Sequence, residues 1–334
     1  MKLKQLALVP ILGLSFGAQA ILYGTEVDRS NHQNLVEMNC TGSIIGGKWI
    51  LTAAHCGADN GISEPIYLPD FSIVYAKTLL EHPDYNNLNV DIGLMELETA
   101  PASEQVSLLK LTDFNVGDTL YAYGFGGTGQ ILSYAVQTVS VPYDYAPPSP
   151  WIMASVYAGQ GDSTGGDSGI GYTDSDGYIR GIHSRTNTYS NEGMEGTHLS
   201  YAEDFILDNV NAWSYPSRKK VNGTEVIKVQ SLHRGTVVDS AYTEGDITID
   251  YDLSTCDDAA VGEFDVCEYH VTSSGEEGKL FLTNSEVVEI NVPEPETSET
   301  PSGGDSGASG GDSGGSMGLL SLVGLLYIVR KRYT

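Results

Sequence analysis

The sequence predicts an all-β protein with many tight turns, and three features support this class. Glycine is frequent, with 39 residues in a chain of 334, and Tyr outnumbers Phe by 20 to 7. The middle of the chain has no long apolar helical stretch. Its apolar segments have the length of short strands and glycine near their boundaries. Tyrosine favours strands and glycine favours tight turns, so composition and segment length point to the same class.

Strand-length segments follow one another through the first two thirds of the chain. They alternate between apolar and polar residues or run continuously apolar, as half-buried and fully buried strands do. They read SIIGGKWILTAA, FSIVYA, DIGLMEL, TLYAYGF, QTVSVPYDY and GYIRGIHS. In the next segment, AEDFILDNVNAW, the spacing of Phe205, Ile206, Val210 and Trp213 predicts one apolar face of a helix. This helix is expected to close a first unit at residue 213.

A second, smaller β-unit is predicted after a linker at residues 214–220. Residues 221–292 contain five further strand-like segments, VIKVQSL, DITIDYDL, FDVCEYHV, KLFL and VVEINV. They suggest a small β-sandwich, immunoglobulin-like in type, clamped by a disulfide between Cys256 and Cys267. No group of residues in this unit suggests catalysis.

The N-terminus has the pattern of a secretory signal. Lys2 and Lys4 precede the apolar stretch LALVPILGLSFG, and small residues end it at Ala18 and Ala20. A membrane anchor is the alternative, and the shortness of the apolar stretch disfavours it. We therefore expect residues 1–20 to be a cleaved signal peptide and the protein to be secreted or to lie at the cell surface.

Charge and cysteine content limit the partners of the protein. With 17 Lys and Arg against 44 Asp and Glu, the formal net charge is −27, which repels nucleic acid and anionic membranes. Export implies an oxidising compartment. The four cysteines, Cys40, Cys56, Cys256 and Cys267, therefore favour two disulfides over metal binding or thiol catalysis.

The C-terminus combines a polar spacer with an apolar segment. Residues 293–316 are rich in Pro, Glu, Ser and Gly and too poor in apolar residues to fold. Residues 317–334 contain MGLLSLVGLLYIV followed by a basic end at Arg330, Lys331 and Arg332. This stretch is short against the about 20 residues that span a bilayer. It resembles the GlyGly-CTERM sorting signals of Gram-negative secreted proteins, which implies sorting and export machinery as a partner. The alternative is a permanent weak anchor that associates with the membrane.

Three residues lie in contexts suited to nucleophilic catalysis. His55 lies in WILTAAHC, Asp91 in NVDIGLMEL and Ser168 in GGDSGIGY. A serine hydroxyl needs a base to become a good nucleophile, and the base needs a group that orients it and stabilises its charge. A lone His or Asp is usually structural. The three contexts together, in this order along the chain, predict a Ser-His-Asp triad.

These segments resemble the signature blocks of the chymotrypsin–trypsin family of serine proteases. The similarity covers roughly residues 21–213 and extends to EHPDYNNLNVDIGLMEL and GIHS. It implies two six-stranded antiparallel β-barrels with the site between them. It also implies peptide-bond hydrolysis through an acyl-enzyme, with protein or peptide substrates and no cofactor or metal. Cys40 and Cys56 would form the disulfide that ties the histidine loop, worth about 3 kcal/mol by chain entropy.

The resemblance also implies a role for each residue. His55 takes the proton of Ser168 and returns it to the leaving amine, while Asp91 holds the imidazole. Ser184 is expected to hydrogen-bond that aspartate. The backbone N–H groups of Gly166 and Ser168 are expected to bind the oxyanion. The other histidines, His32, His82, His183, His198, His233 and His270, are assigned to surface or packing roles.

A second serine lies in a closer match to the GDSGG pattern. Ser313 lies in GDSGG itself, whereas Ser168 is followed by Gly169 and Ile170. Catalysis requires oxyanion donors fixed to a fraction of an ångström, which a disordered spacer does not supply. Ser168 is therefore the predicted nucleophile.

Asp162 is the predicted specificity residue, because trypsin-like members carry an aspartate six residues before the nucleophile, at the base of the primary pocket. A buried carboxylate there favours an Arg or Lys side chain of the substrate. Ser163 also suits a basic ligand, and Ser184 is included in the pocket. Thr186 falls where the family has a glycine and is expected to narrow the entrance, with Gly196 as the opposite wall. The alternative is that Asp162 is only a turn residue.

Ile21 and Asp167 are the predicted activation pair. In this family a new N-terminal Ile places its ammonium beside the aspartate that precedes the nucleophile. Ile21 starts ILYG directly after the predicted cleavage site, so signal peptidase would create the active N-terminus. Leu22 and Tyr23 depart from the usual Val-Gly.

Two other functions compete with the endopeptidase. A catalytically idle homologue would act as an adhesin through residues 221–292, but no triad residue is lost. An esterase would use the same chemistry.

Overall fold

The computed structural model describes residues 20–60, 63–126, 131–140, 151–155, 161–186, 193–257 and 259–293. The predicted signal peptide, spacer and apolar C-terminal segment lie outside these residues, apart from Ala20 and Pro293. The chain divides into a compact unit, Met1–Val292, and a second unit, Pro293–Thr334. Among the described helices, none is both long and apolar enough to cross a lipid bilayer.

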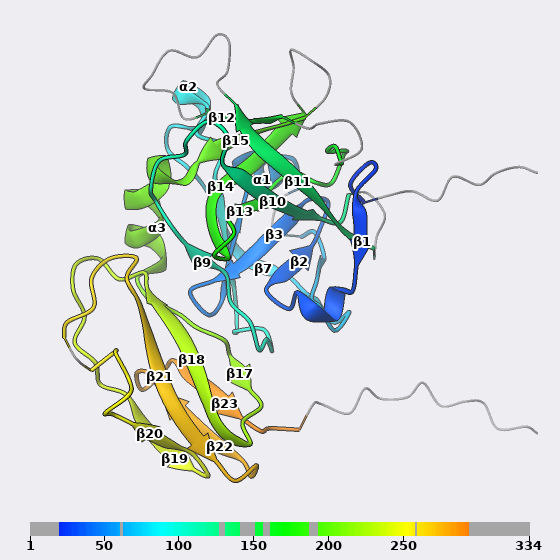
Figure 1. The fold of residues 1–334 in the computed structure, drawn as a ribbon. Helices are drawn as coiled ribbons and strands as arrows, with labels where there is room; N and C mark the ends of the chain where they lie inside the picture. The colour runs from blue at the N-terminus through cyan, green and yellow to red at the C-terminus, as the bar shows by residue number, and fades with distance from the viewer. Residues whose placement is uncertain are drawn as a thin grey trace, which may run out of the picture. The chain divides into compact units, whose positions relative to one another are not determined.

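The described part of the chain is mostly β-structure, and almost all of its strand pairs are antiparallel (Figure 1). The all-β prediction is thus confirmed. The helices are short: η1 Arg29–Asn31, α1 Ala54–Asn60, α2 Tyr85–Leu88, η2 Leu199–Ala202 and α3 Glu203–Val210.

The first large sheet has seven strands and curls on itself. Its strand order is β6-β5-β2-β3-β4-β8-β7. β6 and β7 stand at opposite ends of this order, yet only Tyr75 separates them in the chain. One bent segment therefore joins the two ends, and the sheet has the curvature of a barrel. The strands are β2 Leu35–Glu37, β3 Thr41–Ile45, β4 Trp49–Thr52, β5 Ile66–Tyr67, β6 Ile73–Val74, β7 Ala76–Glu81 and β8 Gly93–Leu97.

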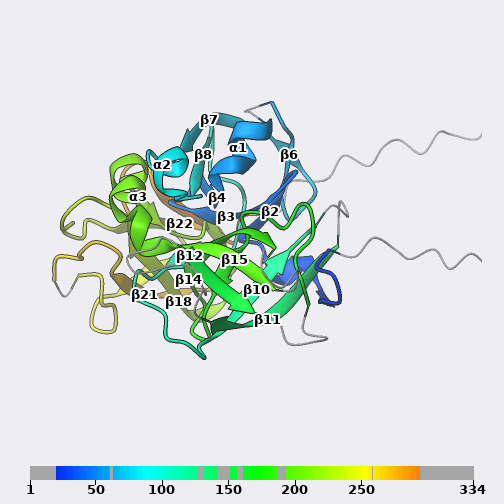
Figure 2. The same cartoon turned by 90° about the horizontal axis from the view of Figure 1, so that it is seen from above.

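The second large sheet contains a closed ring of six strands. The order β11-β10-β13-β14-β15-β12 is completed by a pairing of β12 with β11, while β1 and β9 pair outside the ring. Figure 2 shows these strands together, with α1 beside β7 and β8 of the first sheet. The strands are β1 Thr25–Val27, β9 Leu108–Leu109, β10 Thr119–Gly124, β11 Leu132–Ser140, β12 Trp151–Ser155, β13 Gly171–Thr173, β14 Tyr178–Thr186 and β15 Met194–His198.

Apolar side chains of short strands fill both barrels. β3 and β4 are buried along their whole length, which explains why apolar residues follow one another directly at Ile44 and Ile45 and from Trp49 to Leu51. α3 buries Phe205, Ile206, Leu207 and Val210, as its helical spacing predicts. Trp213 differs from the expectation, because the helix ends at Val210 and Asn211 adopts a left-handed conformation.

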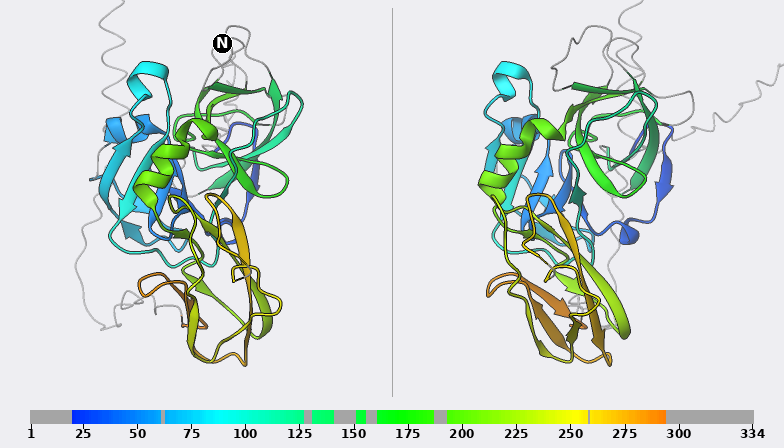
Figure 3. Two further views of the ribbon diagram at one scale, coloured as in Figure 1. Left: turned by 90° about the vertical axis from the view of Figure 1, so that its left-hand side faces the viewer. Right: turned by 60° about the vertical axis from the view of Figure 1, so that its left-hand side comes forward.

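Two four-stranded sheets pack face to face in the remainder of the first unit (Figure 3). Their orders are β16-β18-β21-β20 and β17-β23-β22-β19, around a core that includes Trp213, Tyr269 and the Cys256–Cys267 disulfide. The predicted linker, 214–220, is not a free connection, since it supplies β17 and part of β16. The strands are β16 Trp213–Ser214, β17 Arg218–Lys219, β18 Gly223–Ser231, β19 Tyr242–Gly245, β20 Thr248–Asp250, β21 Val266–Ser273, β22 Gly278–Phe281 and β23 Val287–Ile290.

Candidate active site

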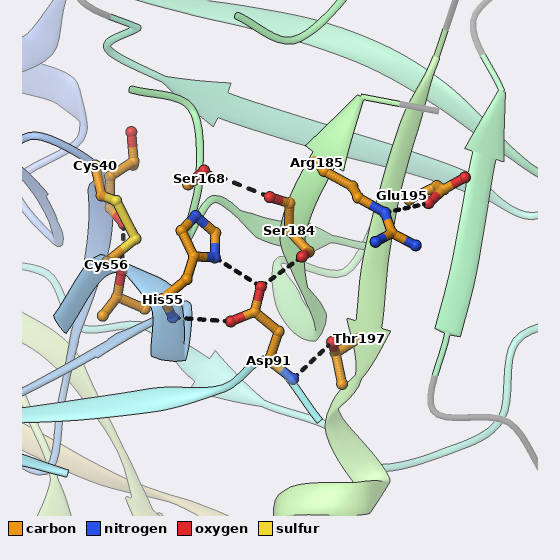
Figure 4. Close-up of polar contacts among 11 residues, drawn as sticks. Cys40, His55, Cys56, Asp91, Ser168, Ser184, Arg185, Glu195 and Thr197 are labelled. Carbon is orange, nitrogen blue, oxygen red and sulfur yellow. Dashed lines mark hydrogen bonds and ion pairs between the residues drawn. A yellow bond between two sulfur atoms is a disulfide. The ribbon is translucent and has the colours of Figure 1, made fainter. Parts of the chain in front are cut away.

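His55 and Asp91 form a hydrogen-bonded pair between α1 and the segment before β8 (Figure 4). Nδ1 of His55 lies 2.7 Å from Oδ2 of Asp91, and the backbone N–H of His55 donates to Oδ1 at 3.0 Å. A carboxylate only accepts hydrogen bonds, so Nδ1 carries the proton and Nε2 is the basic nitrogen of the neutral ring. The aspartate therefore fixes both the tautomer and the orientation of the ring.

Asp91 is buried and has further polar partners. Ser184 donates its hydroxyl hydrogen to Oδ2, and the backbone N–H of Asp91 donates to Oγ1 of Thr197 at 3.2 Å. Burial by itself would raise the pKa of Asp91. The hydrogen bonds and charge of His55, together with the bond from Ser184, outweigh burial and hold the pKa below its ordinary value. Asp91 is therefore ionised at neutral pH.

The turn at Ser168 is held by strands from both barrels. The carbonyl of Ser168 accepts from the N–H of Thr41 at 2.8 Å, and the N–H of Gly169 donates to the carbonyl of His183 at 2.8 Å. Gly169 has a φ of +87°, and a Cβ there would lie 2.2 Å from the carbonyl oxygen of Thr41. Only glycine fits this position, which explains the glycine after the serine.

The hydroxyl of Ser168 lies beside Ser184, the residue that also hydrogen-bonds Asp91. It donates to the carbonyl oxygen of Ser184 at 3.4 Å. In Figure 4 the second ring nitrogen of His55 points toward the side on which Ser168 lies. The fold thus brings together His55, Asp91 and Ser168, which come from three distant segments of the sequence.

Asp167 lies fully buried behind this turn. Its Oδ1 accepts from the N–H of Gly126 at 2.9 Å, and its Oδ2 accepts from the N–H of Thr164 at 2.8 Å. Burial outweighs these two bonds and raises the pKa of Asp167 to about 7. A Cβ on Gly126 would lie 2.3 Å from the carbonyl oxygen of Ala20, so the peptide before Ile21 contacts the same glycine.

Asp162 is linked to the N-terminal segment, to the residue that follows it and to the segment before β15. Its backbone pairs with that of Leu22, with N–O distances of 2.9 and 2.7 Å. Its Oδ1 accepts from the N–H groups of Ser163 at 2.8 Å and Gly193 at 3.1 Å. The hydroxyl oxygens of Ser163 and Thr186 are 2.9 Å apart. The fold therefore gathers Asp162, Ser163 and Thr186, and the contacts of Leu22 had no signal in the sequence because they are made by backbone atoms.

Gly196 lies elsewhere than expected. It pairs with His183 and Ile152 across β15, and a Cβ on it would lie 2.3 Å from the ring of Tyr172. The glycine beside Asp162 is Gly193. The β14–β15 register shifts between His183 and Arg185, so pairing across these strands cannot be counted from sequence spacing.

A buried polar pair supports β13 and β14 from inside the second barrel. The hydroxyl of Tyr172 lies 2.8 Å from Nδ1 of His183, and both side chains are buried. Burial, and then the charge of His55, lower the pKa of His183 to about 3. His183 is therefore neutral and takes a packing role.

Two disulfides are present, and one lies beside the site. Cys40 and Cys56 are bonded, as are Cys256 and Cys267. Cys40, Cys56 and His55 have potential metal-ligand atoms within 4.8 Å of one another. Because both sulfurs are in the disulfide, they are not available as thiolate ligands.

The chain is similar to several known proteases. Snake venom serine protease 1 of Craspedocephalus gramineus is 27% identical over 205 residues, covering 50% of this chain and 78% of that protein. Serine protease 28 of Mus musculus is 31% identical over 123 residues, covering 31% and 45%. The solved structure of the VesB protease of Vibrio cholerae is 17% identical with a TM-score of 0.48, covering 82% of this chain and 100% of that one.

The family model described as Trypsin matches residues 18–205, more than half of the chain. This range contains His55, Asp91, Ser168 and the strands that hold them. The chain belongs to the trypsin family and is a serine endopeptidase.

Proposed function

We propose that the protein is a secreted endopeptidase that cleaves after Arg or Lys, with Ser168 as nucleophile, His55 as general base and Asp91 as the residue that positions His55. The observation that carries the proposal is the 2.7 Å contact of His55 Nδ1 with Asp91, together with the neighbouring hydroxyl of Ser168. His55 accepts the proton of Ser168 as the hydroxyl attacks the substrate carbonyl. It then gives that proton to the leaving amine, and water hydrolyses the acyl-enzyme by the same path.

Gly166 and Ser168 are the proposed oxyanion donors. Within the described part of the chain, their backbone N–H groups have no protein acceptor. Gly166 has a φ of +98°, and its carbonyl accepts from the hydroxyl of Thr41 at 3.2 Å. Donors held in this way need no reorganisation when the tetrahedral oxyanion forms, and one such donor is worth roughly 3 kcal/mol.

Asp162 is the proposed base of the specificity pocket. Its carboxylate is partly buried, and the bonds from Ser163 and Gly193 orient it. The hydroxyls of Ser163 and Thr186 add acceptors for the ammonium or guanidinium of a substrate side chain. A cationic side chain is favoured because it supplies a counter-charge for this partly buried carboxylate.

Ile21 is the proposed N-terminus of the active form, and Asp167 is its partner. Ile21 is fully buried. The carbonyl of Ala20, just before it, lies close to Gly126, and the N–H of Gly126 donates to Asp167. An ammonium on Ile21 would neutralise the buried carboxylate. The Leu22–Asp162 backbone pair would then couple the new N-terminus to the pocket loop.

Secretion is proposed from the N-terminal pattern, in which Lys2 and Lys4 precede an apolar stretch that ends in small residues. Sorting or anchoring through residues 317–334 is proposed from the sequence alone.

The test is hydrolysis of peptides by the wild type and by two matched serine variants. We expect Ser168→Ala to abolish turnover of an Arg-ending chromogenic peptide and Ser313→Ala to leave it unchanged. Wild type should prefer Arg and Lys over small or apolar residues, and Asp162→Ser should remove that preference. Equal turnover by Ser168→Ala and wild type, or a wild-type preference for small residues, would contradict the proposal.

A further inference from the structure

Thr41, in β3 of the first barrel, binds the turn that carries the nucleophile at two points. Its backbone N–H donates to the carbonyl of Ser168 at 2.8 Å, and its hydroxyl donates to the carbonyl of Gly166 at 3.2 Å. Its own carbonyl accepts from the hydroxyl of Thr52 at 2.9 Å. Gly166 and Ser168 are the two residues whose N–H groups are the proposed oxyanion donors. One residue of the first barrel therefore binds both of them.

The second barrel orients the hydroxyl of Thr41. The hydroxyl oxygen accepts from the backbone N–H of Phe125 at 3.3 Å, and its one hydrogen goes to the carbonyl of Gly166. The next N–H along the chain, that of Gly126, donates to Oδ1 of Asp167 at 2.9 Å. Two consecutive N–H groups after β10 therefore hold Gly166 and Asp167, one through the hydroxyl of Thr41 and one directly.

Gly166 depends on such contacts because glycine does not restrict its own backbone. Its φ is +98°, a region that glycine enters and leaves at little cost. The peptide unit between Gly166 and Asp167 is bonded on both sides, since its carbonyl accepts from Thr41 and its N–H donates to the carbonyl of Thr164 at 3.1 Å. Of these two bonds, only the one from Thr41 is made by a side chain. Loss of that hydroxyl would allow the backbone of Gly166 to rotate.

We infer that Thr41 is a positioning residue for the oxyanion site, whose hydroxyl keeps the N–H of Gly166 directed at the tetrahedral oxyanion. The inference rests on the proposed function, which assigns this N–H as a donor. Thr41 is fully buried, so it acts on the reaction through Gly166 and Ser168 and not by contact with substrate. A misdirected donor weakens binding of the transition state more than binding of the substrate, because the negative charge develops only in the transition state.

The first experiment compares two substitutions of Thr41. Thr41→Val removes the hydroxyl and keeps the shape of the side chain. With the peptide that wild type cleaves best, we expect kcat to fall by about ten-fold, as for one hydrogen bond, and KM to change by less than about two-fold. Thr41→Ser restores the hydroxyl, so its kcat should lie within about three-fold of wild type. Titration of active sites corrects kcat for any loss of folded enzyme.

Thr52→Val is the matched control for Thr41→Val. Thr52 is also fully buried, and its hydroxyl donates to the carbonyl of Thr41 and not to Gly166. Its kcat should therefore stay within about two-fold of wild type, even though a buried hydrogen bond is lost. Equal losses of kcat in Thr52→Val and Thr41→Val would show that general loosening, and not the contact with Gly166, lowers turnover.

A pair of peptide inhibitors separates the oxyanion from ordinary binding. In a peptide aldehyde, the oxygen of Ser168 forms a bond to the aldehyde carbon, the carbonyl electron pair moves to the aldehyde oxygen, and the hydroxyl proton passes to His55. The corresponding peptide alcohol has the same side chains but cannot form this oxyanion. Thr41→Val should weaken inhibition by the aldehyde by about ten-fold, and inhibition by the alcohol by less than about two-fold.

Each outcome bears on one of the two proposals. An unchanged kcat in Thr41→Val, equal weakening of aldehyde and alcohol, or failure of Thr41→Ser to recover activity would overturn the role of Thr41. Catalysis by Ser168 and cleavage after Arg or Lys would then still stand. Turnover that persists in Ser168→Ala would instead overturn the proposed function, and the inference with it. If Thr41→Val fails to fold, Thr41→Ala, which also lacks the hydroxyl, replaces it in both assays.

Discussion

Oδ2 of Asp91 accepts two hydrogen bonds at once, one from the hydroxyl of Ser184 and one from Nδ1 of His55 at 2.7 Å. The second bond gives the histidine its tautomer, and the first holds the carboxylate toward it. Because the pKa of the buried aspartate lies below its ordinary value, Asp91 is charged and holds the neutral ring of His55 in place before substrate binds.

Asp91→Asn should lower kcat by about 10⁴-fold at neutral pH, because the same change in related enzymes leaves the catalytic histidine in the wrong tautomer. The amide can donate toward Nδ1, which would leave the proton on Nε2 and remove the base. Steady-state kinetics on an Arg-ending peptide measures the effect, with circular dichroism to verify the fold. Activity within ten-fold of wild type would show that Asp91 does not position the base.

Asp167 should make the stability of the uncleaved chain depend on pH. Its pKa is about 7 in the folded state against an ordinary value of 3.8, so the folded state binds more protons between these values. The contribution of Asp167 to the free energy of unfolding is then greatest below this window and falls as pH rises through it, by on the order of 4 kcal/mol.

The measurement is urea unfolding from pH 4 to pH 8 on a Ser168→Ala form that begins before Ala20. Asp167→Asn should remove the part of the pH dependence of the unfolding free energy that comes from this carboxyl group. A form that begins at Ile21 should also lack it, because the ammonium offsets the carboxylate. An identical slope in all three forms would contradict both the buried charge and the activation pair.

Arg29→Met should destabilise the protein by about 3–5 kcal/mol, because it leaves Glu37 buried without its cation. Arg29 lies 3.1 Å from Glu37, donates to the carbonyls of Tyr67 and Leu68, and packs on the ring of Phe125. Adding Glu37→Gln should recover part of the loss. Urea unfolding measures both variants.

Lys77→Met is the matched control for Arg29. Lys77 pairs with Glu96 at 3.4 Å but is 55% exposed, so its removal should cost less than about 1 kcal/mol. Equal losses of unfolding free energy in Arg29→Met and Lys77→Met would show that burial of the ion pair does not determine how much its removal destabilises the protein.

Gln230→Leu should weaken the attachment of the C-terminal sheets to the second barrel. The amide of Gln230 is fully buried, accepts from the N–H of Leu109 at 2.8 Å, and donates to the carbonyls of Leu109 at 2.7 Å and Phe264 at 2.8 Å. Leucine leaves these backbone groups unpaired, at a cost of about 2–4 kcal/mol.

Thermal unfolding should therefore show a lower Tm for Gln230→Leu, while kcat/KM at low temperature stays that of wild type. Glu225→Gln, at an exposed position of the same strand, should change stability by less than about 0.5 kcal/mol. An unchanged Tm for Gln230→Leu would mean that the amide bridge does not contribute.

Several elements were predictable because their cause is local. β4 begins with three apolar residues in a row, Trp49 to Leu51, and the buried face of α3 follows helical spacing as far as Val210. The end of that helix was not predictable in the same way. Asn211 turns the chain, and Trp213 in β16 then pairs with Ser231 at the end of β18. This pairing is set by another strand and not by the local sequence.

The residues of the proposed pocket show the same limit of prediction from local sequence. Asp162 was predicted from its offset to Ser168, Ser163 as the residue after it, and Thr186 from the family resemblance, and the fold brings the three together. Gly193 was not selected, because its place beside Asp162 depends on the shifted register of β14 and β15. Strand register is decided by pairing across the sheet and cannot be read from one strand.

The sequence by itself determined the β-class, the identity of the three catalytic candidates and the cysteines, since these depend on residue type and local pattern. Only the tertiary structure decided that Leu22 pairs with Asp162, that Gly193 lies beside Asp162, and that Glu195 forms an ion pair with Arg185 across β14 and β15. These contacts are made by backbone atoms and by buried charges from distant strands. Their energy comes from exclusion of water, which exists only once the barrels have closed.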